Sequence, residues 1–160
     1  MDTTSQPVIE KLTDVETVAS IPFKGVHLVA KYIWLLQDWI LLNGLHPAGT
    51  PSCTIGIGYH DEPEHYVGIP CEAQWRISGP PIPGKDGVVI KTLPPQRVLS
   101  TYHLGDTNLT FTSFQAIMKV VTAKGYRING PLREIYLFDL SAPKSKWITE
   151  CQIPVEHIMG

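Results

Sequence analysis

The chain has 160 residues, of which 43% are hydrophobic and 18% charged, and its formal charge at neutral pH is −2. This size predicts one domain with a core of ordinary size, and the near-neutral charge lacks the basic stripe that direct nucleic-acid binding requires. Three cysteines without a Cys-x-x-Cys pair argue against a disulfide framework and a zinc site, so we expect a reducing compartment. We also expect no cofactor and no metal.

The ends and the apolar stretches indicate a cytoplasmic protein. Residues 1–7 lack the basic region and apolar run of a signal peptide. The most apolar stretch, 26–42, is interrupted by polar residues such as Lys31 and Asp38, and we do not expect it to span a bilayer. The expected state is a monomer or homodimer without a membrane partner.

The first half of the chain predicts strands on both sides of one helix. β-rich runs predict strands at 8–12, 15–23, 53–60 and 67–77, the last two joined by a polar turn at 61–64. Apolar side chains recur at helical spacing at Val29, Tyr32, Ile33, Leu36, Trp39 and Ile40. Asn43-Gly44 is expected to end this helix.

The second half predicts the same order of elements. Residues 78–87, rich in proline and glycine, form a linker that cannot hold regular structure. Strands are expected at 88–93, 97–103, 133–138 and 147–155. Helical spacing links Phe111, Phe114, Ile117, Met118 and Val121, with Asp106, Thr107 or Asn108 as the cap and Gly125 as the stop.

The two halves resemble each other at an offset of 80 or 81 residues. Gly44 and Gly49 return as Gly125 and Gly130, and the segment 72–74 (Glu-Ala-Gln) returns at 150–152 as Glu-Cys-Gln. This predicts a tandem duplication of a β-α-β-β unit, with repeats at about 8–77 and 88–158. We expect an α+β fold with antiparallel pairing and a ligand site where the copies meet.

Glu134 is the residue best suited to a functional role. Strand alternation places it on one face with Tyr136 and Phe138. A carboxylate beside two rings on an internal strand requires a cation, a proton or a hydrogen-bond donor. The alternative is that Glu134 lies on a solvated face or pairs with an arginine.

Matching Gly49 with Gly130 aligns Cys53 with Glu134, so one copy has an ordinary core strand where the other is polar. This predicts a pocket with one polar and one apolar wall, suited to flat or cationic molecules. His103 either lines the pocket or is a satisfied histidine at a strand end, and Trp34 either covers the pocket, forms a dimer contact or is half exposed. The predicted ligand-binding residues are Glu134, Tyr136, Phe138, Cys53, Ile55, Trp34, Trp75, Tyr102 and His103.

The segment 60–65 has the residue types of a metal site, but its ligands lie on one turn with a proline, where charges are expected for solvation. We therefore predict no metal there. No Gly-x-Ser-x-Gly elbow or phosphate-binding glycine loop occurs in the chain.

Several of these segments resemble a known family. They are the 102–105 turn, the Gly125-Tyr126 helix stop, the 130–137 strand (Gly-Pro-Leu-Arg-Glu-Ile-Tyr-Leu) and the closing 150–155 strand. Together they resemble the GyrI-like small-molecule-binding domain, which also serves as the effector-binding module of bacterial multidrug-responsive transcription regulators. The resemblance implies an antiparallel sheet curled toward a barrel, with Glu134 as the carboxylate that meets cationic or polar ligands and Tyr136 beside it.

The resemblance leaves three functions open. The leading hypothesis is a protein that senses or sequesters amphipathic, aromatic or cationic small molecules, because Glu134 lies beside aromatic residues where the copies meet. We expect it to be free-standing, because only about seven residues precede the first predicted strand. The second is a hydrolase of reactive electrophiles, with Glu134 as general base and Tyr136 or Tyr102 orienting the leaving oxygen. The third is a protein-protein regulator such as an inhibitor of DNA gyrase.

Overall fold

Nine strands and two main helices occur in the computed structural model, which describes residues 6–56, 68–80 and 82–158. The strands are β1 (Ile9–Leu12), β2 (Glu16–Lys24), β3 (His46–Ile55), β4 (Pro70–Ser78), β5 (Val89–Leu93), β6 (Arg97–Leu104), β7 (Tyr126–Ile128), β8 (Leu132–Tyr136) and β9 (Ile148–His157). The helices are α1 (Val29–Leu42) and α2 (Thr110–Lys124). The predicted α+β class is confirmed.

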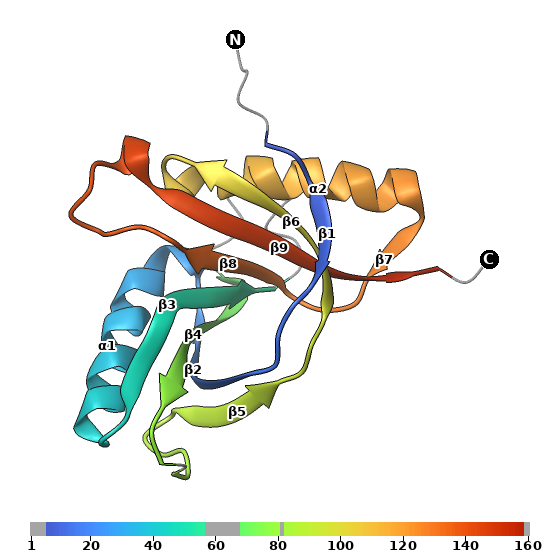
Figure 1. Cartoon of the computed structure of the whole chain (residues 1–160). Helices are drawn as coiled ribbons and strands as arrows, with labels where there is room; N and C mark the ends of the chain where they lie inside the picture. Colours follow the sequence, from blue (N-terminus) through green and yellow to red (C-terminus); the bar gives the residue numbers. More distant parts are fainter. Residues whose placement is uncertain (1–5, 57–67, 81, 159–160) are drawn as a thin grey trace.

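All strand pairs are antiparallel, in the order β1-β6-β9-β8-β3-β4-β2-β5, and β7 pairs with the far end of β9. The expected curl toward a barrel does not lead to closure. β1 and β5 each have one neighbour in this order, and a barrel requires its two edges to hydrogen-bond to each other. The sheet is therefore open, although it bends strongly between its two halves (Figure 1).

The centre of the sheet joins the two halves of the chain. β3 from the first half pairs with β8 from the second, with Cys53 opposite Glu134. The leading strands cross over, because β1 pairs with β6 of the second half and β5 pairs with β2 of the first. Strands from both halves therefore interlock around the β3-β8 pair.

Both helices contact the same side of the sheet, which we call the helix-covered face. α1 packs against β2, β3 and β4, and α2 packs against β6, β7 and β9. The buried helix residues are Leu36, Trp39 and Ile40 in α1 and Thr110, Phe114, Ile117 and Val121 in α2. The other side is the open face, and it carries the alternate residues of each strand, such as Thr54 and Arg133.

The ends of the helices follow the sequence signals. α1 ends at Leu42 before Asn43, and Gly44 has a φ of 78°. α2 ends at Lys124, and the C-cap residue Gly125 has a φ of 70°, which is left-handed and suits glycine. The Asp106 side chain accepts a hydrogen bond from the backbone N–H of Asn108, at the start of the 3₁₀ turn that leads into α2. Asp106 therefore caps this 3₁₀ turn and not α2 itself, whose N-cap residue Leu109 makes no side-chain cap hydrogen bond.

Strand pairing confirms two expectations and corrects one boundary. The predicted antiparallel pairs are β3 with β4 and β8 with β9. However, β3 begins at His46 rather than at residue 53, because a bulge between Ala48 and Ser52 accommodates Gly49 and Pro51, which are residue types typical of loops. The predicted continuation of this strand to residue 60 and the turn at 61–64 lie outside the described residues.

Two shorter segments complete the comparison. The three-residue strand β7 was missed, since so short a run shows no alternation. Of the predicted linker, Ser78 belongs to β4, and 79–80 and 82–87 have no helix or strand. No helix among the described residues is long and apolar enough to cross a membrane.

Candidate functional site

Glu134 lies in the middle of the sheet, on β8 between β9 and β3. Its side chain is on the helix-covered face with Leu132 and Tyr136, and only 2% of the residue is exposed. An isolated charge at such a depth is costly, because it loses its hydration. No ion pair to Glu134 occurs among the described residues, which rules out the alternative of a solvated or arginine-paired carboxylate there.

Two hydroxyl groups bind the Glu134 carboxyl group. The Tyr136 hydroxyl donates to Oε1 at 2.7 Å, and the Thr110 hydroxyl contacts Oε2 at 2.5 Å. Burial raises the pKa of Glu134 to about 7, while the hydrogen bonds from Thr110 and Tyr136 act in the opposite direction. The carboxyl group therefore gains or loses its proton near neutral pH, where an approaching cation can decide its state.

Thr110 also fits the protonated form of Glu134. Its hydroxyl lies 3.0 Å from the carbonyl oxygen of Thr107, to which it can donate. A hydroxyl has one proton to donate, so it cannot serve both acceptors at once. When Glu134 is protonated, its own O–H can donate to Thr110, which then donates to Thr107. Ionisation requires the Thr110 proton to turn toward Glu134.

Buried cysteines flank Glu134 on both neighbouring strands. The register pairs Glu134 with Cys53 on β3 and with Cys151 on β9. Burial, and to a lesser extent the nearby carboxylate of Glu134, raises the pKa of both thiols, so they remain neutral. Cys53 is thus beside Glu134 on the adjacent strand and not on a distant wall of a pocket.

A row of aromatic rings continues from Tyr136. The Tyr136 and Phe138 rings meet edge to face with centroids 5.9 Å apart, and Phe138 stacks on Trp147 at 4.3 Å with 10° between the ring planes. The Trp147 indole N–H donates to the carbonyl oxygen of Ala142. The row therefore joins the buried carboxyl group to the connection between β8 and β9.

The other predicted ligand-binding residues differ in their distance from Glu134 and in their exposure. Ile55 is fully buried on the same face as Cys53, and Trp75, also on this face, donates its indole N–H to the carbonyl oxygen of Gly49. Trp34 lies on α1 with 53% of its surface exposed. It is half exposed, as one of the alternatives had it.

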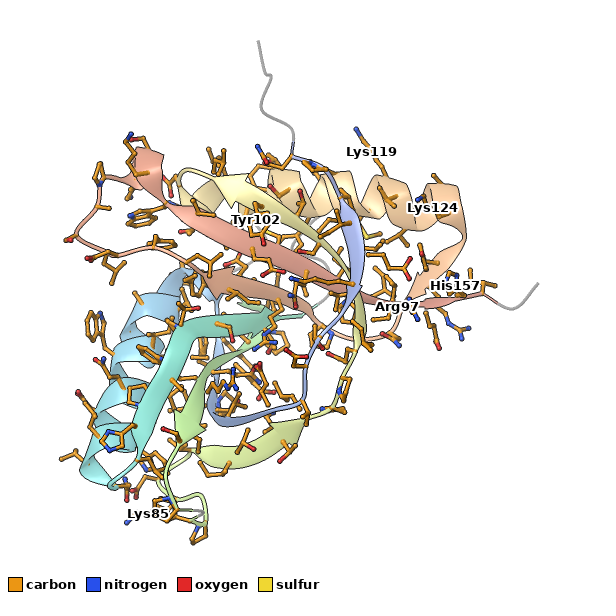
Figure 2. All side chains as sticks on the ribbon, viewed as in Figure 1. Lys85, Arg97, Tyr102, Lys119, Lys124 and His157 are labelled. Atoms are coloured by element: carbon orange, nitrogen blue, oxygen red, sulfur yellow. The ribbon has the colours of Figure 1, made fainter. Side chains whose placement is uncertain are left out.

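Tyr102 and His103 lie on opposite sides of β6. Tyr102, which is labelled in Figure 2, is on the open face and 40% exposed. The structure therefore does not bring it to Glu134, which lies on the helix-covered face. His103 is buried, its Nδ1 lies 2.9 Å from the Ser113 hydroxyl and its Nε2 lies 2.9 Å from the Asp106 carbonyl oxygen. Burial lowers the pKa of His103. It is a satisfied histidine at a strand end.

Thr110 and Cys151 are the neighbours of Glu134 that the sequence analysis missed. A threonine at the predicted start of α2 was the available signal, but nothing in the sequence says which strand that helix end approaches. The segment 60–65 lies outside the described residues, and no metal-binding group of three or more His, Cys, Asp or Glu occurs within them.

A family model for the GyrI-like small molecule binding domain matches residues 9–156, which is nearly the whole chain. The chain belongs to this GyrI-like family. A comparison of this chain with curated proteins found no match.

Solved structures share the GyrI-like fold. EcmrR in complex with DNA is 19% identical with a TM-score of 0.81, and the alignment covers 96% of this chain and 58% of the EcmrR chain. The C-terminal domain of EcmrR is 18% identical with a TM-score of 0.79, and the alignment covers 97% of this chain and 100% of that domain. A hydrolase encoded by lin2189 from Listeria innocua is 12% identical with a TM-score of 0.63, and the alignment covers 93% of this chain and 91% of the hydrolase. SAV2435 bound to tetraphenylphosphonium is 15% identical with a TM-score of 0.54, and the alignment covers 96% of this chain and 94% of SAV2435. At these identities the similarity shows the fold, and this chain spans 58% of the EcmrR chain in the DNA complex.

Proposed function

We propose that this GyrI-like chain binds amphipathic, aromatic or cationic small molecules at Glu134. The observation that carries the proposal is a fully buried carboxyl group whose pKa is about 7 and which is bound by two hydroxyls. A bound cation would compensate the charge that burial disfavours, and the rings of Tyr136, Phe138 and Trp147 would contact its apolar body. The complex of SAV2435 with tetraphenylphosphonium supports this ligand class.

The start of α2 is the proposed gate of this site. Thr110, the first residue of α2, lies directly against the Glu134 carboxyl group, so a ligand that reaches the carboxylate takes the place of the Thr110 hydroxyl. The turn at 107–109 has no buried residue and can move without exposing core. We therefore expect ligand binding to displace residues 107–110 while the sheet keeps its register.

Titration with tetraphenylphosphonium tests the proposal, with Glu134→Gln as the decisive variant. The glutamine keeps the shape and cannot ionise, so we expect its affinity to fall by roughly 1–3 kcal/mol, the value of a charge-assisted contact. Asp38→Asn removes the same charge from an exposed position of α1 and should bind like the wild type.

The pH dependence separates a carboxylate contact from simple burial of an apolar cation. Binding to the wild type should tighten from pH 6 to pH 8, because the ionised fraction of Glu134 increases through its pKa of about 7. Glu134→Gln should lose this dependence. Equal affinities for the wild type and the glutamine variant at pH 8 would overturn the proposal.

We further propose that the chain is one cytoplasmic domain of two β-α-β-β copies that senses or sequesters its ligand. Two features support the duplication: the strand order around the β3-β8 pair is alike in the two halves, and the Glu-x-Gln segments of β4 and β9 both follow the open face. EcmrR, which shares the fold, occurs in a complex with DNA, and a ligand-sensing role is compatible with that neighbour. Residues 88–158 expressed alone should be unfolded. In that fragment β5 lacks its partner β2 from the first half, and β6 lacks its partner β1.

A hydrolase is the second candidate, and the same carboxyl group favours it. A pKa of about 7 suits a general base at neutral pH, and Tyr136 is in place to orient a leaving oxygen. Tyr102 is not, because it lies on the open face. Turnover of a strained cyclopropane or epoxide by the wild type, and its loss in Glu134→Gln, would establish the enzyme. Stoichiometric capture without turnover would leave binding as the function.

A further inference from the structure

α1 carries apolar side chains on the side that faces away from the sheet. Its buried side packs against β2, β3 and β4, and Figure 1 shows no other helix or strand of the described chain on its outer side. Five large apolar residues are nevertheless exposed there, with 38% to 84% of each residue accessible to solvent. They are Leu28, Trp34, Leu35, Leu41 and Leu42, and we call them the α1 patch.

The α1 patch forms two lines along the helix. Leu28, Leu35 and Leu42 follow one another at intervals of seven residues, and so do Trp34 and Leu41. Seven residues are about two turns of a helix with 3.6 residues per turn, so each series stays on one line. A single exposed leucine needs no explanation, but a contiguous apolar surface marks a contact site. A helix that is apolar on all sides is normally covered on all sides.

The second helix has no such patch, although it covers the same face of the sheet. None of the exposed large apolar side chains among the described residues lies on α2. The exposed positions of α2 include Thr112, Gln115, Lys119 and Lys124, which are residue types that interact well with water. The outer side of α2 is therefore a solvated surface, whereas the outer side of α1 is suited to a partner.

Two charged residues between the apolar lines decide which partner fits. Lys31 and Asp38 are both exposed, and seven residues correspond to about 10 Å along a helix, which is too far for an ion pair between them. The Lys31 ammonium lies 5.5 Å from the centroid of the Tyr32 ring, a contact that uses no hydrogen bond. Neither Lys31 nor Asp38 forms an ion pair with another described residue.

A second copy of the chain pairs both charges at once. When two α1 helices pack antiparallel around a twofold axis between residues 34 and 35, Lys31 lies level with Asp38 of the partner subunit, and Asp38 lies level with the partner's Lys31. Trp34 and Leu35 then lie at the axis, where each meets its own counterpart. Parallel packing would instead place like charges against each other, so the charges select the antiparallel arrangement.

We propose that the α1 patch is the interface of a homodimer, formed by two antiparallel α1 helices. One side of such a helix covers less than the roughly 800 Å² per partner of a standard interface, so we expect a dissociation constant in the micromolar range. A helix that binds membranes carries several Lys or Arg residues on its polar face, whereas α1 has Lys31 alone. The interface is separate from the Glu134 site and does not depend on the proposed function. In dilute solution the chain is monomeric, so Asp38→Asn remains a control for Glu134.

Sedimentation velocity over a series of protein concentrations tests the proposal. We expect the wild-type chain to change from monomer to dimer at micromolar concentrations. Leu35→Glu places two carboxylates at the twofold axis and should raise the dissociation constant at least about tenfold. Gln115→Glu introduces the same charge at an exposed position of α2 and should dimerise like the wild type. Leu35 is 46% exposed in the single chain, so we expect the Leu35→Glu monomer to fold.

Lys31→Glu and Asp38→Lys test the charge pairing across the axis. Each variant alone brings like charges together and should weaken dimerisation about tenfold. An equimolar mixture of the two variants should regain the wild-type affinity, because the introduced glutamate then faces the introduced lysine. Damage to the monomer would not be reversed by mixing.

Three results would overturn the proposal. They are a wild-type chain that stays monomeric at all concentrations, a Leu35→Glu variant that dimerises like the wild type, and a mixture of Lys31→Glu and Asp38→Lys that does not recover. A chain that stays monomeric but sediments with vesicles of phosphatidylcholine and phosphatidylglycerol would assign the α1 patch to lipid instead.

Discussion

Replacing Glu134 with glutamine should change how the stability of the folded protein depends on pH. Burial raises the pKa of Glu134 from its ordinary value of 4.5 to about 7. Between these two values the folded state holds a proton that the unfolded state has released, so the free energy of unfolding falls as pH rises. The stabilisation that the protonated Glu134 gives the folded state is complete below about pH 4.5 and is lost above about pH 7.

The size of the effect follows from the two pKa values. Each pKa unit corresponds to about 1.4 kcal/mol, so the difference between 4.5 and about 7 gives about 3 kcal/mol in all. Roughly 2–3 kcal/mol of this should be lost between pH 5 and pH 8. Glutamine imitates the protonated acid, because its NH₂ group can donate to Thr110 and its oxygen can accept from Tyr136.

Urea denaturation of the wild type and Glu134→Gln at pH 5 and pH 8 measures this difference directly. The lowered pKa of His103 contributes with the opposite sign, but it is present in both proteins and cancels in the comparison. Asp38→Asn, at an exposed position of α1, should keep the wild-type pH dependence. If Glu134→Gln shows the same loss of stability between pH 5 and pH 8 as the wild type, Glu134 is not protonated in the folded protein and the burial argument fails.

Three further outcomes test the local structure. Thr110→Val should lower the free energy of unfolding by about 1 kcal/mol in urea titrations, because the Glu134 carboxyl group loses one of its two hydroxyl partners; unchanged stability would show that this contact contributes nothing. Gly125→Ala should cost about 1 kcal/mol in thermal unfolding through its left-handed φ alone, since no atom lies within 4 Å of the added methyl group; a variant as stable as the wild type would contradict the left-handed cap. The three free cysteines are buried and should react with a chromogenic disulfide reagent only after unfolding, so rapid reaction of the native protein would contradict their placement in the core.

Much of the local structure was predictable from the sequence, because local signals decide it. Helical spacing and the glycine stops predicted α1 and α2, and strand alternation put Glu134 and Tyr136 on one face, where the structure shows them hydrogen-bonded. The same local rules failed at β3, because a bulge lets Gly49 and Pro51 remain within a strand.

Only the tertiary structure decided what surrounds Glu134. Alternation separates the two sides of a strand, but it does not say which side a helix covers or which distant strand lies next to it. The pairing of β3 with β8 put Cys53 beside Glu134, and the packing of α2 brought Thr110 to its carboxyl group. The register of β6 turned Tyr102 to the other face. These contacts join residues far apart in the chain, and they form because the two halves bury their apolar faces together, a constraint that no short stretch of sequence contains.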